Sequence, residues 1–458
     1  MRRIALEYLN NWKNRSNRKP LILRGARQVG KSYLVRIFAE KEGLDLLELN
    51  LETEIGIIEC FQSKNPKEII TLLELKKNQK IVPGKTILFL DEIQKATEIF
   101  ASLRYFYEQL PELHVILAGS LFDFVFEEHN FSMPVGRIEY FYLGPMTFKE
   151  FLEGLGKENL SQYLSSYSIQ DKLSETLHEE LLKLFKIYLV IGGMPEAVQI
   201  YRDTNSFLEV DRIKKSILLT YRDDFSKYSS PGKKSILQKI FQTLPASVGK
   251  KIKYMNLAPD EKIHDIKKAL HLLEMARIYT PVFHSAGSTI PLRAQVNEKI
   301  QKCLMLDVGL LNSAYGYSYV DFISLENDAL FNIGNICEQF IGQHLLYIGE
   351  TFDEPELHYW VREKSQSSAE LDFLISVGQK IIPIEVKSGK TGKLKSLQSF
   401  LKEKEISFGV RFNANLPILQ KADFSLPNTK GEFQLLSLPV YMVEDVIRHI
   451  KSVLQINK

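Results

Sequence analysis

Short apolar runs alternate with helical patterns over the first 160 residues of the chain. The runs lie at 20–24, 44–51, 87–90, 115–117 and 138–143. Such runs are typical of strands that are buried on both faces. After the first run, apolar residues recur at helical spacing, as Leu34, Val35 and Phe38 do. The alternation predicts an α/β fold with a doubly wound parallel sheet over residues 1–160.

The pattern changes to helices after the last of these runs. Leucines at helical spacing, among them Leu177, Leu181 and Leu184, predict a helical lid over residues 161–230. Within the lid, the segment 192–195 (Gly-Gly-Met-Pro) predicts the end of one helix and the start of another. The segment 230–234 (Ser-Pro-Gly-Lys-Lys) predicts a linker to the next domain.

Residues 231–320 combine helical patterns with two extended segments. The third helical pattern carries Ile266, Leu270 and Leu273 on one face, and an extended segment, a turn and a second extended segment follow it. Three helices followed by a hairpin predict a winged-helix-like domain, a fold that often binds DNA. Its lysines could contact phosphates, or they could form a solvated face that only packs between domains, namely Lys250, Lys251, Lys253, Lys267 and Lys268.

Composition narrows the class of protein. The 458 residues suggest several domains, and Lys plus Arg total 59 against 56 for Asp plus Glu, which leaves a net charge of only +3. Nucleic-acid binding would therefore have to be local. Cys60, Cys303 and Cys337 lack the spacing of a disulfide framework or a zinc site, which favours a reducing compartment. We expect no signal peptide and no membrane span, hence a cytoplasmic protein.

A glycine-rich loop between the first strand and the first helix of the sheet points to phosphate binding. The loop fits the pattern G-x-x-x-x-G-K-[ST] and comprises Gly25, Ala26, Arg27, Gln28, Val29, Gly30, Lys31 and Ser32. Its backbone N–H groups and the helix N-terminus would hold phosphate oxygens. Lys31 would neutralise the β- and γ-phosphates of ATP, and Ser32 would place its hydroxyl on Mg²⁺.

Two acids at the end of a later strand extend this site. The apolar run 86–90 ends in Asp91 and Glu92, where the carboxyl end of a parallel strand meets a ligand. Asp91 would hold Mg²⁺, and Glu92 would orient and deprotonate the attacking water. The run before Ser120 ends in a small polar residue, which is a candidate sensor of the γ-phosphate.

An arginine finger has two candidates. Arg137 lies on the loop after the sensor strand, and Arg104 lies on the helix after the acid pair. Either guanidinium could reach the γ-phosphate of a neighbouring subunit in a homo-oligomer, and a surface salt bridge is the alternative for both. The sequence does not choose between them, and it leaves the oligomeric state open.

These motifs resemble those of a large group of prokaryotic AAA-type ATPases. The resemblance is carried by the segments 24–32, 90–94 (Leu-Asp-Glu-Ile-Gln), 118–120 (Ala-Gly-Ser) and 192–197 (Gly-Gly-Met-Pro-Glu-Ala), and it covers nearly the whole chain. In that group a P-loop domain precedes a C-terminal domain related to PD-(D/E)XK nucleases. The resemblance implies an ATPase core with Lys31, Ser32, Asp91, Glu92 and Ser120 in the roles given above, and it supplies no biological task.

The last domain, residues 321–458, carries a second set of charged residues. Two extended runs around a turn near Gly378 predict a β-hairpin that places Asp372 almost opposite Glu385, with Lys387 on the same side as Glu385. Glu338, on a preceding helix, faces the apolar side and needs a partner there. The three acids could hold a second Mg²⁺ or Mn²⁺ while Lys387 activates water for phosphodiester cleavage.

This arrangement matches the D…E-x-K core of PD-(D/E)XK nucleases, in which a helix glutamate has a similar place. The alternative is an exposed salt-bridge pattern on a fold that serves only for binding. The sequence as a whole predicts an ATP-hydrolysing conformational switch that is coupled to a nuclease-like domain, with DNA as the expected ligand. An ATP-gated, metal-dependent DNA nuclease and a noncatalytic adaptor for a protein partner remain the alternatives.

Overall fold

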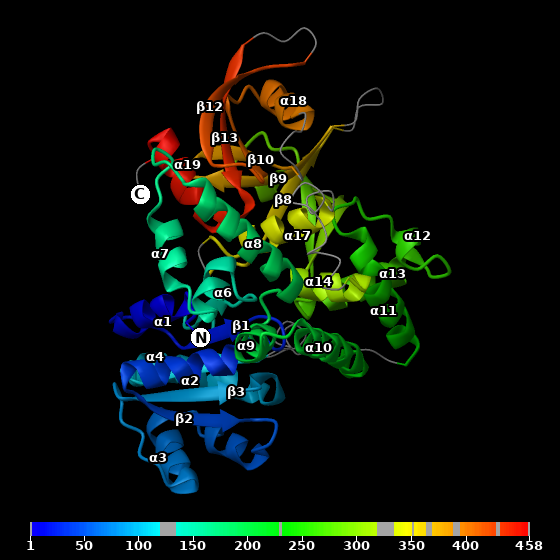
Figure 1. The fold of residues 1–458 in the computed structure, drawn as a ribbon. Coiled ribbons are helices and arrows are strands. Elements are labelled where there is room, and N and C mark those ends of the chain that lie inside the picture. Colours follow the sequence, from blue (N-terminus) through cyan, green and yellow to red (C-terminus); the bar gives the residue numbers. More distant parts are fainter. Residues whose placement is uncertain are drawn as a thin grey trace. The chain divides into compact units, whose positions relative to one another are not determined.

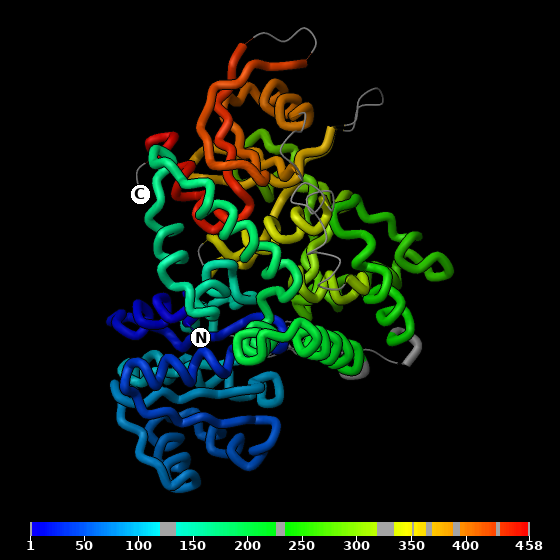
Figure 2. The backbone as a smooth tube through the Cα atoms, viewed as in Figure 1, coloured from blue at the N-terminus to red at the C-terminus, as the bar shows by residue number. Residues whose placement is uncertain are grey.

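The computed structural model divides the chain into two compact units. It describes residues 2–119, 134–228, 231–317, 334–349, 352–362, 369–387, 394–426 and 431–456. The first unit comprises residues 1–144 with the short segments 272–278 and 350–355, and the second comprises the rest of the chain. In Figure 2 the blue to cyan part of the tube follows the main segment of the first unit.

The first unit is built on a five-stranded sheet in the order β2-β3-β4-β1-β5. Its strands are β1 (Leu21–Arg24), β2 (Asp45–Asn50), β3 (Thr86–Asp91), β4 (His114–Ala118) and β5 (Glu139–Tyr142). Figure 1 labels three of these strands, β1, β2 and β3. Every neighbouring pair is parallel. The predicted parallel sheet is confirmed, and β4 lies between the strand that precedes the glycine loop and the strand that ends in the acids.

Helices cover both faces of this sheet. They are α1 (Ala5–Asn14), α2 (Lys31–Glu42), α3 (Pro66–Lys77) and α4 (Phe100–Gln109), with the 3₁₀ turns η1 (Ile55–Phe61), η2 (Ile93–Lys95) and η3 (Thr97–Ile99). Buried residues of α3 and α4 form one core with Leu47, Leu88 and Val115 of the sheet. The buried residues of α2 lie outside that core, and α2 packs against β2, β3 and β4. The sheet is therefore doubly wound.

The second unit is built on an eight-stranded mixed sheet in the order β12-β13-β11-β10-β9-β8-β6-β7. Its strands are β6 (Tyr279–Ser285), β7 (Val296–Met305), β8 (Leu357–Val361), β9 (Glu370–Val377), β10 (Lys380–Val386), β11 (Phe408–Asn413), β12 (Ile418–Asp423) and β13 (Glu432–Pro439). The hairpin β6–β7 joins the other strands through the parallel pair β6–β8. The hairpin expected in the winged-helix-like domain and the strands expected in the nuclease-like domain thus belong to one sheet.

Many helices accompany this sheet along the chain. They are α6 (Phe148–Gly154), α7 (Glu158–Ser166), α8 (Glu175–Ile191), α9 (Pro195–Thr204), α10 (Phe207–Tyr228), α11 (Pro231–Thr243), η4 (Leu244–Ser247), α12 (Tyr254–Leu257), α13 (Ile263–Met275), η5 (Leu292–Gln295), α14 (Val308–Tyr315), α17 (Gly334–Leu345), α18 (Lys395–Lys404), η6 (Val440–Asp445) and α19 (Val446–Leu454). The predicted helix break at 192–194 is confirmed. The linker predicted at 230–234 is wrong from Pro231 onward, because proline fits the first turn of a helix and α11 begins there.

The glycine pair between α8 and α9 is fixed by close backbone contacts within the second unit. Gly193 N donates to Asp307 Oδ2 at 2.6 Å, and Gly193 O accepts from Met146 N at 2.6 Å. A Cβ atom at Gly192 would lie 2.1 Å from Asp307 Oδ1, and one at Gly193 would lie 2.1 Å from Met146 O. Both positions therefore require glycine for packing as well as for ending the helix.

Buried polar side chains of α17 tie the lid helices to the rest of the second unit. Gln343 accepts from Val308 N at 2.8 Å and donates to the Tyr188 hydroxyl at 3.1 Å. His344 Nε2 accepts from Phe148 N at 3.0 Å. Because these groups are buried and paired, they fix the geometry of the elements that they join. The lid is thus an integral part of the second unit.

Two further observations concern the chain as described. None of its described helices is both long enough and apolar enough to cross a membrane. All three cysteines are free thiols in buried positions.

Candidate functional site

The glycine-rich loop connects β1 to α2, and its backbone has a positive φ at two glycines and at Gln28. Gly25 has φ +151°, and a Cβ atom there would lie 2.3 Å from Leu143 O. Gly30 has φ +93° and caps the N-terminus of α2, and Gln28 also has a positive φ. Arg3 donates from Nη1 to Val29 O at 2.9 Å and so supports the loop from behind. The sequence contained no signal for this role of Arg3, because the arginine lies far before the motif.

Lys31 is buried at the start of α2 and lies inside the loop. Its Nζ donates to Gly25 O at 2.9 Å and to Ala26 O at 2.8 Å. Burial lowers the pKa of Lys31 to about 8, although the nearby carboxylates of Glu92 and Asp91 oppose this shift. The loop therefore holds a desolvated ammonium whose partners are two neutral carbonyls, and this is an arrangement that favours a bound anion.

Ser32 and Asp91 meet although 59 residues separate them. The Ser32 hydroxyl donates to Asp91 Oδ2 at 2.7 Å. The next residue, Glu92, has a left-handed backbone with φ +55°, and its carboxylate accepts a hydrogen bond from Gln94 Nε2. Gln94 belongs to the segment 90–94 that carries the family resemblance, but no role was predicted for its side chain.

These residues fit a nucleotide phosphate with its Mg²⁺. A serine hydroxyl and a carboxylate side by side are hard oxygen ligands of the kind that Mg²⁺ prefers. The ammonium of Lys31 and the helix N-terminus that begins at Lys31 provide positive charge for the phosphates. All eight loop residues from Gly25 onward lie among the described residues.

The remaining expected residues of this site are placed only in part. Ser120 lies outside the described residues. Arg137 and Arg104 both donate from Nε to Glu108 Oε1, at 2.9 and 3.0 Å. Both side chains are substantially exposed, so the surface salt bridge that was the alternative for each arginine is present in the single chain. A shared carboxylate does not distinguish between the two candidates.

The hairpin β9–β10 in the second unit brings the second set of charged residues together. Lys380 pairs with Val377 and Ile384 with Phe373, and this register continues to place Asp372 beside Glu385. Asp372 Oδ2 accepts from Val386 N at 2.7 Å, and the Lys387 ammonium contacts the Glu385 carboxylate. The hairpin that the sequence predicted is present.

A lysine that the sequence did not indicate lies among these acids. Lys302 of β7 places its Nζ 2.9 Å from Glu338 Oε1, 2.6 Å from Glu370 Oε1 and 3.7 Å from Asp372 Oδ1. Its side chain is only 2% exposed. Glu338 was expected to need a partner on the buried side of its helix, and that partner is an ammonium group.

The carboxylate cluster comprises Glu338, Glu370, Asp372 and Glu385, and burial shifts the pKa values of three of its members. Burial raises the pKa of Glu338, of Asp372 and of Glu385 above the usual range. Burial alone would lower the pKa of Lys302, but the carboxylates around it raise that pKa well above its usual value. Lys302 is therefore charged.

The second metal ion expected at Glu338, Asp372 and Glu385 has no support from the geometry. In the part of the chain that the structure describes, no three or more His, Cys, Asp and Glu side chains form a group that could hold a metal ion. Two of the three expected ligands, Glu338 and Asp372, instead contact the ammonium of Lys302.

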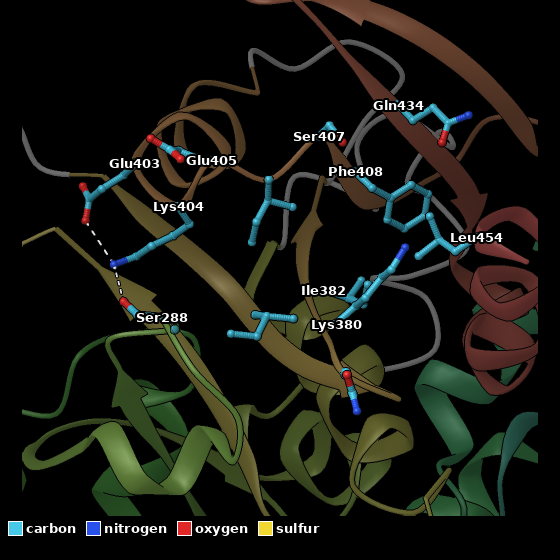
Figure 3. A pocket seen from close by; sticks show the side chains of 14 residues that line it. Ser288, Lys380, Ile382, Glu403, Lys404, Glu405, Ser407, Phe408, Gln434 and Leu454 are labelled. Carbon is cyan, nitrogen blue, oxygen red and sulfur yellow. Dashed lines mark hydrogen bonds and ion pairs between the residues drawn. The ribbon is translucent and has the colours of Figure 1, made fainter. Parts of the chain in front are cut away.

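A hollow of about 650 Å³ lies elsewhere in the second unit. Figure 3 shows Lys404 at its wall, where the ammonium contacts Ser288 and Glu403. None of the expected site residues lines this hollow. The ammonium of Lys404 is thus paired with neighbouring residues of the hollow.

Comparison with protein families assigns three segments of the chain. Residues 17–152 match the family model of an AAA domain. Residues 182–321 and 333–434 match the models of two domains of unknown function, DUF8612 and DUF4143. No curated protein matches the chain.

Among solved structures, similarity is low. The chain is 10% identical to C. elegans PCH-2, with 44% of this chain and 62% of that one covered and a TM-score of 0.27. For AMPPCP-bound DnaA from Aquifex aeolicus the identity is 15%, the coverage 59% and 87%, and the TM-score 0.27. For the RuvB Holliday junction branch migration motor of Thermotoga maritima the values are 16%, 60% and 87%, and 0.28. Scores of this size do not establish a common fold. The family match and the topology of the parallel sheet together show that the chain carries an AAA domain at residues 17–152.

Proposed function

We propose that this protein is an ATP-hydrolysing conformational switch that depends on Mg²⁺. The observation that carries the proposal is the 2.7 Å hydrogen bond from Ser32 Oγ to Asp91 Oδ2, because it joins the end of the glycine loop to the end of β3. Ser32 and Asp91 would hold Mg²⁺, which neutralises developing charge on the phosphates. The loop residues 25–30 would hold the phosphates through their backbone N–H groups.

Two charged side chains would carry the chemistry. Lys31 would exchange its hydrogen bonds to the carbonyls of Gly25 and Ala26 for phosphate oxygens, which recovers the cost of its burial. Glu92 would accept a proton from the attacking water, and its hydrogen bond from Gln94 would have to open for this step. Arg137, or Arg104 in its place, would leave Glu108 to act as a finger in a neighbouring subunit, and Ser120 would sense the γ-phosphate.

Steady-state phosphate release tests this proposal. Lys31→Ala is expected to reduce kcat/KM for ATP by about 100-fold or more, and Glu92→Gln to retain nucleotide binding while kcat falls by about 100-fold. Lys41→Ala is the matched control, since Lys41 is an exposed lysine on the same helix. If the Lys31→Ala and Glu92→Gln proteins turn over ATP as fast as the Lys41→Ala protein, the site is not an ATPase site.

The second unit would carry the output of the switch, and we propose DNA as its ligand. The support is a set of exposed lysines before α12 and on α13, namely Lys250, Lys251, Lys253, Lys267 and Lys268. Together with α11 and the hairpin β6–β7 these helices follow the order of elements in a winged helix. We place the activity in the cytoplasm, where free cysteines stay reduced.

DNA binding is tested by fluorescence anisotropy of a labelled duplex at two salt concentrations. Replacing Lys250, Lys251 and Lys253 by glutamate is expected to weaken binding and to make its dependence on salt less steep, because phosphate contacts release counterions. Each of the three single changes is compared with Lys172→Glu, which alters the net charge by the same amount at an exposed lysine of the lid. If no duplex is retained by the wild-type protein even at low salt, the noncatalytic adaptor for a protein partner replaces DNA in this proposal.

A metal-dependent nuclease is the second candidate for the output. The alignment of Asp372 with Glu385 and the contact of Glu385 with Lys387 favour it. Its test is nicking of supercoiled DNA with Mn²⁺, with and without ATP, by the wild-type and the Lys387→Ala proteins. Nicking that Lys387→Ala abolishes would support it, and its absence would leave the second unit as a binding domain.

A further inference from the structure

The ammonium of Lys302 lies among carboxylates that come from two other elements of the second unit. Glu338 comes from α17, and Glu370 and Asp372 come from β9. Lys302 Nζ lies 2.9, 2.6 and 3.7 Å from the nearest oxygens of these three side chains. The ammonium also lies 5.2 Å from the ring centroid of Tyr359, within the range of a cation–π contact.

The ammonium of Lys302 is buried in this position together with its partner Glu338. The Lys302 side chain is 2% exposed and that of Glu338 is 11% exposed. An ammonium at that depth is tolerated only where opposite charges and hydrogen-bond acceptors replace its water. Three carboxylates provide both, whereas moving the ammonium away would leave buried carboxylates without their cation.

A divalent metal ion would compete for the same oxygens. Lys302 contacts Glu338 Oε1 and Asp372 Oδ1, which are atoms of two of the three residues that a metal site would need. Mg²⁺ binds oxygen ligands at about 2.0–2.1 Å, so that an ion on these oxygens would lie next to the ammonium. Like charges at that separation repel strongly in a buried site. The two cations therefore exclude each other.

We propose that Lys302 is the resident cation of the carboxylate cluster and holds the place of a divalent metal ion. The second unit then keeps the hairpin and the acids of a nuclease-like site without metal-dependent cleavage. The contacts of Lys302 instead fasten β7 to α17 and to β9, which joins the hairpin β6–β7 to the strands beyond residue 320. The inference concerns the second unit alone and does not depend on ATP hydrolysis.

One observation favours a bound metal ion at the carboxylate cluster instead. Glu385 Oε2 is buried and finds no hydrogen-bond partner among the residues that the structure describes. A metal ion between Glu385 and Asp372 would be such a partner, and this makes a direct measurement of metal binding the decisive test.

The experiment measures Mn²⁺ binding to the full-length protein by electron paramagnetic resonance without nucleotide. All proteins carry Asp91→Asn, so that the Mg²⁺ ligand proposed in the first unit does not contribute. The protein with Lys302 is expected to show no saturable binding at millimolar Mn²⁺. Lys302→Met keeps the apolar stem and removes the charge, and it is expected to bind one Mn²⁺ per chain. Adding Asp372→Asn to Lys302→Met should abolish that binding.

Two results would overturn the proposal. One is saturable Mn²⁺ binding by the protein that retains Lys302, lost on Glu385→Gln or Asp372→Asn, because the metal and the ammonium would then coexist. The other is a folded Lys302→Met protein that binds no Mn²⁺, because something other than the ammonium would then exclude the metal. If Lys302→Met does not fold, Lys302→Gln replaces it, and the protein with Lys302 still decides the first of these results.

Discussion

Replacing Gly192 by alanine should destabilise the second unit far more than the same change at Gly156, another glycine with a positive φ. Gly192 has φ +79° and ψ −170°, a conformation that is almost confined to glycine. Its alanine Cβ would lie 2.1 Å from Asp307 Oδ1. Gly156 also has a positive φ, +73°, but nothing lies within 4 Å of its Cβ position. Gly156→Ala is therefore the matched control, since it carries backbone strain without the collision.

The expected loss of stability follows from the hydrogen bonds that Asp307 would lose. To avoid the new methyl group, Asp307 must turn away from Gly193 N and Leu310 N, which donate to it at 2.6 and 3.0 Å. Each buried group left without its hydrogen bond costs about 1–3 kcal/mol, and the backbone strain adds about 1–3 kcal/mol. We expect Gly192→Ala to cost about 3–9 kcal/mol and Gly156→Ala about 1 kcal/mol. The first figure approaches the whole stability of a typical domain.

Hydrogen exchange read by mass spectrometry measures the two effects separately. A protein with two units need not unfold in one step, so that a local readout is preferable to a single melting temperature. Gly192→Ala should speed exchange at the amides of α8 and α14, while Gly156→Ala should leave them unchanged. Adding Asp307→Ala removes the collision, and the double variant should cost less than the sum of the two single changes. Equal protection in the Gly192→Ala and Gly156→Ala proteins would refute the reasoning.

Three further predictions concern the glycine loop, the acid pair and the response to pH. Gly25→Ala should weaken ATP binding by about tenfold or more, because a backbone carbonyl lies 2.3 Å from the new Cβ. Gly43→Ala, with a positive φ and open space, should bind ATP normally in the same titration. Gln94→Ala should raise kcat by up to about tenfold, since it releases Glu92 from one hydrogen bond to a charged group. A fall in turnover would instead give Gln94 a positioning role. Burial lowers the pKa of His344 to about 4, so that its neutral ring contributes stability above pH 6.5 that is lost as the pH falls toward 4. His344→Gln should remove up to about 3 kcal/mol of this acid sensitivity, measured by urea unfolding at pH 4 and 7, and an unchanged dependence on pH would contradict it.

The features that the sequence predicted best are those that depend on residues close together in the chain. The run 115–117 became β4, and Asp91 and Ser32 lie where a strand end and a loop end were expected, because each position follows from a local apolar pattern with a polar end. The linker prediction failed at Pro231 for a related reason. Proline, glycine and lysine are typical of linkers, but a proline can also start a helix, and only the helix that follows decides between them.

Long-range pairing was beyond the reach of such patterns. Asp307 fixes the glycine pair at 192–193 across more than a hundred residues, and the motif alone indicated only a helix break. The winged-helix-like region and the last domain looked separate because each has its own run of elements. The register of β6 with β8 instead makes them parts of one sheet, and pairing between strands so far apart in the sequence leaves no trace in either segment.

Lys302 shows how a pattern of charged residues can be complete and still be misread. The pattern D…E-x-K counts two acids and Lys387 on a hairpin, and with Glu338 it invites a metal ion as the balancing charge. In the folded chain the same space contains four carboxylates, since Glu370 joins them, and two ammonium groups. A metal ion is required to balance the acids only if no other cation lies among them. Lys302 of β7, which lies outside the hairpin, is such a cation. The chemistry of such a site therefore depends on the total charge that the fold assembles, which is why Lys302→Met should change its metal binding although no residue of the motif is altered.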